Sequence, residues 1–238
     1  MRKLNLSPQL QSWRNRSNSS QAGLTLVEGL VAILVVSAVT VSLTPAIFLA
    51  VATRVQNRRA EQAIQLAHGQ IDQVRVLIEQ GIQADTVTQL PFDVGESTDL
   101  TQIASPSSAF DKLQSTNFEC SVYDRAPTQV PVESALPVDV NGDCEEDFFV
   151  QTFRANDQTV SDDGQEIPII FDMGVRVYYK NARFGTLETE EASLQLTNGE
   201  GQQTSRPLAV LYTTLAQADR SQSLRKYRCM LGDEGSCD

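Results

Sequence analysis

Residues 23–53 read GLTLVEGLVAILVVSAVTVSLTPAIFLAVAT, and this stretch decides how the rest of the chain is interpreted. The 25 residues from Gly29 to Thr53 carry no charge, and Glu28 is the single charged side chain between positions 17 and 53. A helix needs about 20 apolar residues to cross the hydrocarbon core of a bilayer. The length and the lack of charge favour a transmembrane helix over residues 24–53 rather than a buried core helix.

The net charge of the 238-residue chain, -11, is an average over unequal parts. Residues 1–23 hold four basic and no acidic side chains, residues 54–80 hold four basic and three acidic ones, and residues 81–238 hold 11 basic and 26 acidic ones. Basic residues collect on the cytoplasmic side of membrane helices, so we expect a cytoplasmic N-terminus and an extracytoplasmic domain over residues 81–238. The acidity of that domain argues against nucleic acid as a partner, because phosphate binding needs clustered Lys and Arg.

The apolar stretch is preceded by Gly23-Leu-Thr-Leu-Val-Glu28. This motif resembles the type III signal of type IV pilins and pseudopilins, which reads G-F-T-L-[IV]-E before a long apolar run. The resemblance implies that a prepilin peptidase cuts after Gly23 and that the new N-terminal amine, on Leu24, is methylated. Leu24 departs from the family pattern, in which Phe is commonest. Residues 1–23 would then be a basic leader that is removed, while residues 24–53 stay in the mature protein as an anchor and assembly helix.

Glu28 is the one acid in the predicted span. The positive end of the helix dipole favours a carboxylate in the first turn, yet a charge in the membrane costs about 2.5–3.5 kcal/mol and usually has a partner. The resemblance implies that this partner is the free amine of a neighbouring subunit; a Glu that only snorkels to the interface is the alternative. Pro45 matches a proline that loosens the pilin helix, because proline removes a backbone donor. Ser42 and Thr44 are expected to bond the freed carbonyls.

Beyond the span, apolar residues recur at spacings of three and four, which predicts an amphipathic continuation of the helix over residues 54–80. These residues are Ala60, Ile64, Ala67, Ile71, Val74 and Ile78. Gly81 is the expected helix terminator. The predicted continuation gives the helix one apolar side on which a domain can pack.

Strand-forming runs follow at residues 148–153, 167–179 and 208–212. Residues 81–145 are rich in proline and turn formers, which breaks any long element there. Two dipeptides are turn candidates, Asp163-Gly164 and Asn198-Gly199. This order predicts an α+β fold in which an antiparallel β-sheet packs on the long N-terminal helix, as in the pilin fold.

All four cysteines lie in the part expected outside the cytoplasm, where disulfides are allowed. They are Cys120, Cys144, Cys229 and Cys237, and four cysteines permit three connectivities. We favour Cys120–Cys144 across the turn-rich region and Cys229–Cys237 at the C-terminus, with reduced thiols as the alternative.

The segment Asp139-Val-Asn-Gly-Asp-Cys-Glu-Glu-Asp147 places oxygen groups at alternate positions around a glycine, as calcium needs. It resembles the D-x-N-G-D-G-x-x-D calcium loops of extracellular repeat proteins. By that match, calcium would be held by Asp139, Asn141, Asp143 and Asp147 through their side chains and by Glu145 through its carbonyl. Cys144 replaces the usual glycine, so a disulfide in place of metal and a solvated acidic turn are the alternatives. No other cofactor is indicated.

No catalytic arrangement is recognisable, and the chain has one histidine, His68. The leading hypothesis is a structural minor pilin or pseudopilin of the inner (cytoplasmic) membrane, drawn with other subunits by an assembly platform into a type IV pilus-like filament or a secretion pseudopilus. Residues 47–59 are similar to cyanobacterial pseudopilins linked to polysaccharide secretion and gliding motility. The alternatives are a type II protein secretion pseudopilin, a single-span adhesin or binding module that never polymerises, and a membrane-tethered enzyme.

Overall fold

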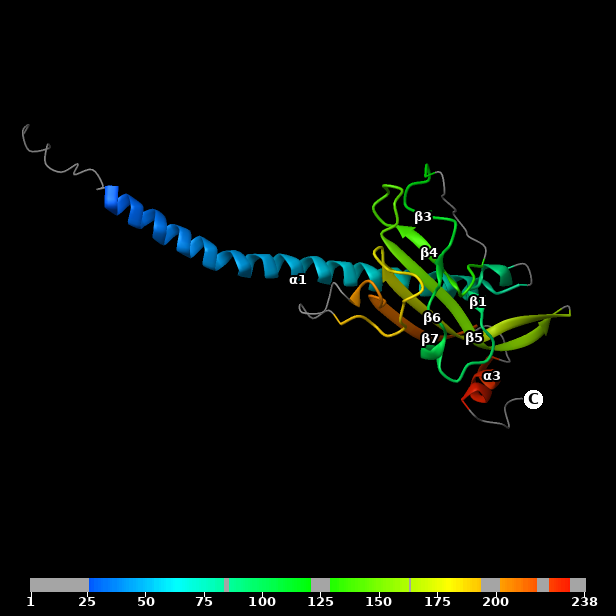
Figure 1. Cartoon of the computed structure of the whole chain (residues 1–238). Helices are drawn as coiled ribbons and strands as arrows, with labels where there is room; N and C mark the ends of the chain where they lie inside the picture. The colour runs from blue at the N-terminus through cyan, green and yellow to red at the C-terminus, as the bar shows by residue number, and fades with distance from the viewer. Residues whose placement is uncertain are drawn as a thin grey trace, which may run out of the picture. The chain divides into compact units, whose positions relative to one another are not determined.

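The structure is a computed structural model that describes residues 26–83, 86–120, 129–162, 164–193, 202–217 and 223–231 (Figure 1). It divides into two compact units between Val51 and Ala52. The predicted leader and the predicted cleavage site at Gly23 and Leu24 lie outside the described residues.

The helix α1, Leu26–Gln80, has 55 residues and runs from one unit into the other. The predicted span and its amphipathic continuation are therefore one element, and Pro45 lies inside it without ending it. Gly81 ends the helix as predicted: its φ is +89°, and its N–H donates to the carbonyl of Ile78 at 3.1 Å. A left-handed φ costs glycine little because it has no Cβ.

The second unit contains a seven-stranded sheet with the main order β2-β4-β5-β6-β7. Its strands are β1 (Phe92–Asp93), β2 (Ser108–Ala109), β3 (Gln114–Ser115), β4 (Ser134–Asp139), β5 (Phe148–Asp162), β6 (Gln165–Tyr179) and β7 (Ala209–Ala216). Strands β4 to β7 pair antiparallel, whereas the two-residue strands β1, β2 and β3 pair parallel with β5 or β4. Two 3₁₀ turns, η2 (Val87–Gln89) and η3 (Leu100–Gln102), and a short helix, α3 (Ser223–Met230), complete the described elements.

The predicted α+β class is confirmed, and each of the three predicted strands is present. Strands β5 and β6 form a hairpin in which Asp162 pairs with Gln165, and the turn candidate Asp163-Gly164 falls between these two residues. Gly164 has a φ of +82°, and Asp163 lies outside the described residues, as does the second turn candidate, Asn198-Gly199. Strand β4 was not predicted, because Pro137 within it reads as a breaker.

One face of the sheet packs on the second half of α1. The buried helix residues are Gln56, Ala60, Ala63, Ala67, Ile71, Val74 and Ile78, and the strand residues packed with them include Val150, Met173, Val175 and Val177. Ile64, predicted in this stripe, is 41% exposed, and Ala63 replaces it. One residue turns the helix by about 100°, so Ile64 points beside the sheet, while the small alanines let helix and sheet approach closely.

The other face of the sheet is covered by the segment before β2. Arg176 alternates with Val175 and Val177, so its side chain points away from α1, yet it is fully buried. Its guanidinium donates to the carbonyls of Leu100 at 2.9 Å and Ile103 at 2.7 Å. A buried charge is tolerated where hydrogen bonds satisfy it, so Arg176 holds this segment on the sheet.

Candidate functional site

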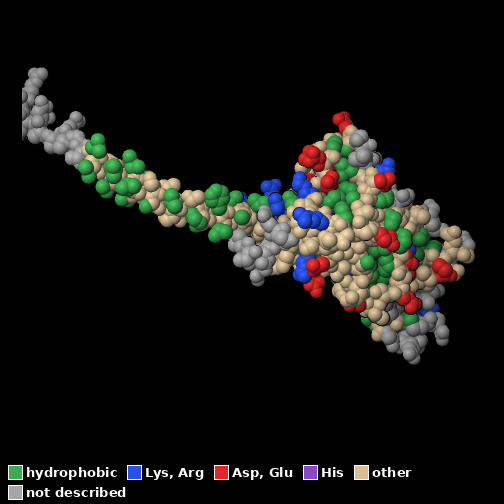
Figure 2. Space-filling model, viewed as in Figure 1, with side chains coloured by type: hydrophobic (Ala, Val, Ile, Leu, Met, Phe, Trp, Pro, Cys, Tyr) green, Lys and Arg blue, Asp and Glu red, His purple; other side chains and the backbone are tan. Residues whose placement is uncertain are grey.

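The candidate assembly segment is the described helix of the first unit, residues 26–51. Its 15 large apolar side chains are between 51% and 84% exposed, and no residue of the segment is buried (Figure 2). Leaving apolar surface in water costs about 25 cal/mol per Å², so a continuous surface of this kind marks a membrane or protein contact. Among the described residues, α1 is the one helix that is long and apolar enough to cross a membrane.

Glu28 lies in the first turn of α1, and its side chain is exposed. The N-terminal end of a helix carries a partial positive charge, which favours a carboxylate at this place. The predicted role of Glu28 in assembly depends on an amine at residue 24, outside the described residues, and it stays a prediction.

Pro45 deprives the carbonyl of Val41 of its usual N–H donor. The nearby hydroxyls do bond carbonyls, as expected, but at other positions: Thr44 Oγ1 donates to Thr40 at 2.7 Å, and Ser42 Oγ donates to Val39 at 2.8 Å. Hydroxyls in helices reach carbonyls three or four residues back, and both side chains select a carbonyl other than that of Val41. The loosening of the helix at Pro45 stays a prediction.

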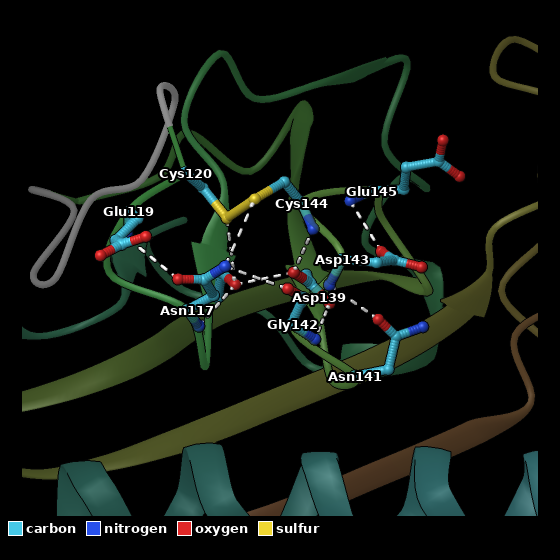
Figure 3. Close-up of a disulfide and its surroundings, with 10 residues drawn as sticks. Asn117, Glu119, Cys120, Asp139, Asn141, Gly142, Asp143, Cys144 and Glu145 are labelled. Atoms are coloured by element: carbon cyan, nitrogen blue, oxygen red, sulfur yellow. Dashed lines mark hydrogen bonds between the residues drawn. A yellow bond between two sulfur atoms is a disulfide. The ribbon is translucent and has the colours of Figure 1, made fainter.

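The second candidate region is the Asp139–Asp147 loop, which connects β4 to β5. The predicted Cys120–Cys144 disulfide is present, with a Cα–Cα distance of 5.4 Å, and it ties this loop to the segment after β3 (Figure 3). Cys229 is also disulfide-bonded, and its predicted partner, Cys237, lies outside the described residues. Disulfides persist in oxidising compartments, so these bonds and the apolar helix are consistent with a single-pass anchor and an extracytoplasmic domain.

Asp139 is the acceptor around which the loop closes. Its side chain is 1% exposed; it accepts the N–H of Gly142 at 2.7 Å, the N–H of Cys144 at 2.9 Å and the hydroxyl of Ser115 at 2.7 Å. Burial by itself would raise the pKa of Asp139, but these hydrogen bonds stabilise the charged form more and hold the pKa below its ordinary value. Asp139 is therefore an ionised structural group.

Two loop residues have left-handed backbone, Gly142 with φ +84° and Cys144 with φ +68°. Side chains other than glycine rarely adopt this conformation. Cys144 stands where calcium loops have glycine, and it takes the glycine conformation while bonded to Cys120. A disulfide-bonded cysteine thus has the left-handed backbone that glycine favours.

The other predicted side-chain ligands of calcium accept backbone N–H groups of the loop itself. Asn141 Oδ1 accepts the N–H of Asp143 at 2.8 Å, Asp143 Oδ1 accepts the N–H of Glu145 at 2.9 Å, and Asp147 Oδ2 accepts the N–H of Val140 at 3.0 Å. Figure 3 shows the side chains of Asn141, Asp143 and Glu145 spread around the loop. Within the described part of the chain, no three His, Cys, Asp or Glu residues are placed to hold a metal ion. The Cys120–Cys144 disulfide closes this turn, and calcium binding by the loop stays a prediction.

Sequence reasoning assigned no role to Arg59, which the structure places at the start of the domain. Its guanidinium lies 4.4 Å from the centroid of the Tyr179 ring. The available signal was local: Arg54, Arg58 and Arg59 follow the charge-free stretch directly.

Comparisons of this chain with protein families, curated proteins and solved structures find no match. The long apolar N-terminal helix packed on an antiparallel sheet is a pilin-like architecture.

Proposed function

We propose that this chain is a structural minor pilin or pseudopilin that assembles through residues 24–53 into a type IV pilus-like filament or a secretion pseudopilus. The observation that carries the proposal is the assembly segment, which exposes its apolar side chains on all sides. A helix that is apolar all round needs an apolar environment all round. A bilayer supplies it before assembly, and neighbouring helices of the same kind supply it afterwards.

The proposed path begins in the inner membrane, with the N-terminus in the cytoplasm. Prepilin peptidase removes residues 1–23 and methylates Leu24, and an assembly platform then draws the mature protein out of the lipid. Glu28 pairs with the amine of a neighbouring subunit. Opposite charges 4 Å apart attract by about 4 kcal/mol at an effective dielectric constant of 20, which matches the roughly 2.5–3.5 kcal/mol cost of a charge in the membrane.

The finer proposal is a part in polysaccharide secretion and gliding, supported by the likeness of residues 47–59 to cyanobacterial pseudopilins. A type II protein secretion pseudopilin uses the same physics and is the first alternative. A single-span adhesin that does not polymerise is the alternative of another class. Replacement of Glu28 distinguishes it from both filament proposals, because only a filament subunit needs Glu28 for assembly. We assign no reaction to the chain, which makes the membrane-tethered enzyme the weakest alternative.

The test is Glu28→Ala in the full chain, with Glu61→Ala as the matched control. Both remove an exposed acid from α1, and Glu61 lies beyond the apolar stretch. We expect Glu28→Ala to reduce surface filaments or secretion more than tenfold while membrane insertion is retained, and Glu61→Ala to leave both unchanged. The intact mass in the same samples should show loss of residues 1–23 and one added methyl.

Unchanged filaments and secretion in Glu28→Ala would contradict assembly and favour the adhesin. An uncut N-terminus would contradict the processing step.

A further inference from the structure

We propose that a group of cations at the start of the domain binds the phosphate headgroups of anionic lipids in the leaflet facing the domain. This basic collar consists of Arg54, Arg58, Arg59, Lys180 and Arg183. The inference rests on the membrane anchorage of the proposed function and is independent of filament assembly.

The collar is assembled around Arg59. Its guanidinium stacks on the ring of Tyr179, 4.4 Å from the centroid, which places the last residue of β6 beside the first helical turns of the domain. Lys180 follows Tyr179 directly and is exposed. A cation over an aromatic ring is attracted by the negative face of the ring, so this contact fixes the position of the Arg59 guanidinium.

The segment after β6 adds a further cation, Arg183, which the segment before β7 links to Arg59. Gln203 Oε1 accepts from Arg59 at 3.5 Å, and the carbonyl of the next residue, Thr204, accepts the N–H of Arg183 at 2.8 Å. Figure 2 shows Lys and Arg side chains gathered at this end of the domain. Two segments far apart in the sequence, residues 54–59 and residues 180–183, therefore contribute cations to this surface, and residues 203–204 bridge them.

These cations have no carboxylate partner among the described residues, in a domain whose side chains are strongly acidic overall. Glu188 and Glu190, which follow Arg183 in the sequence, are instead paired with Arg206 at 2.7 and 3.5 Å. The acidic turn at residues 143–147 adjoins Lys180, whose N–H donates to the carbonyl of Asp147 at 3.1 Å. Lys180 is thus the weakest member of the collar, and the helix arginines are its strongest.

The helix places these arginines at headgroup depth. From Glu28 to Arg54 the chain rises by about 39 Å at 1.5 Å per residue, and a bilayer with its headgroups is about 40–45 Å thick. Arg54 and Arg58 are four residues apart, so they lie on one side of α1, and both are exposed. A guanidinium binds phosphate in a two-point geometry, and basic residues next to a membrane are attracted to anionic lipids.

The test uses the full chain in nanodiscs with equal amounts of phosphatidylcholine and phosphatidylglycerol. Native mass spectrometry counts the lipids that stay bound after release. We expect the wild type to retain phosphatidylglycerol preferentially, and the double variant Arg54→Gln/Arg58→Gln to lose this preference by roughly fivefold for each arginine removed. Arg75→Gln is the matched control, since Arg75 is an exposed arginine of the same helix, paired with Asp72 and far from the collar in sequence; it should keep the preference.

Equal retention of the two lipids by the wild type would overturn the proposal, and so would equal loss in the Arg75→Gln control. Inorganic phosphate that binds the wild type without a bilayer and displaces phosphatidylglycerol would show a free-anion site instead. Loss of filaments in the double variant with unchanged lipid preference would assign the arginines to a neighbouring subunit. Glu28→Ala should keep the lipid preference, which separates failure of this inference from failure of assembly.

Discussion

The two halves of α1 share one backbone conformation and have opposite surroundings. Residues 26–51 are apolar on every side, and none of them is buried. In residues 52–80 the buried positions recur every three or four residues, and the stripe that they form packs against the sheet. The contrast shows that the helix forms in both cases and that the distribution of apolar residues around it selects the partner. A stripe is satisfied by one sheet, whereas an all-round apolar surface needs lipid or several helices.

The comparison also concerns residue size. The buried stripe includes Ala60, Ala63 and Ala67, whose small side chains permit close packing with the sheet. The assembly segment instead carries Val, Ile, Leu and Phe at its exposed positions. Large apolar side chains on all sides suit a contact with adaptable lipid tails or with other helices, while the three alanines of the stripe let the helix approach the sheet closely there.

The largest effect is expected from removing the same atoms in each half. Ile71 is 5% exposed, and Ile47 is 63% exposed. Ile71→Ala should lower the free energy of unfolding of the domain by about 2–5 kcal/mol, because it leaves a cavity in the core. Ile47→Ala should leave it unchanged. Urea unfolding of the full chain in detergent, monitored by circular dichroism, measures both free energies. Equal losses in the two variants would contradict the contrast between the two halves of α1.

The next largest effect is expected from removing the Cys120–Cys144 disulfide, which should destabilise the second unit alone. The double variant Cys120→Ala/Cys144→Gly should cost the domain about 2–4 kcal/mol, since the unfolded chain gains conformational freedom. Membrane insertion of the assembly segment should not change. Cys120→Ala/Cys144→Ala should be less stable than the glycine version, because φ at position 144 is +68°. Equal stability of the two variants in urea would show that the turn relaxes without the disulfide.

The smallest effect is expected at Asp139, which makes the stability of the domain depend on pH. Asp139 has a pKa below its ordinary value in the folded domain, so its contribution is present above the unfolded pKa, about 3.9, and is lost as pH falls through the folded pKa. Asp139→Asn should destabilise the domain at neutral pH by about 1.5–3 kcal/mol and should lose less stability on acidification than the wild type. Parallel urea titrations at pH 7 and pH 3 decide this, and identical pH slopes would contradict it.

Sequence reasoning found the elements whose signal is local and missed those that depend on distant contacts. The helix, its end at Gly81, the β5–β6 hairpin and one disulfide were predicted. Strand β4 was missed because Pro137 discourages a strand, although the parallel and antiparallel neighbours of β4 supply enough pairing to hold it. Arg176 was missed because strand alternation places it opposite the core, and alternation does not tell that the segment around Leu100 covers that face.

The long helix, the different character of its two halves and the motif that ends at Glu28 follow from the sequence alone, because hydrophobic periodicity and motif spacing involve only residues close together in the chain. Tertiary packing accounts for the replacement of Ile64 by Ala63 in the stripe, for the role of Asp139 as a hydrogen-bond acceptor and for the contact of Arg59 with Tyr179. Each of these depends on residues that are distant in sequence, such as Ser115 beside Asp139 or Tyr179 beside Arg59. Only the packed domain brings such pairs within contact distance.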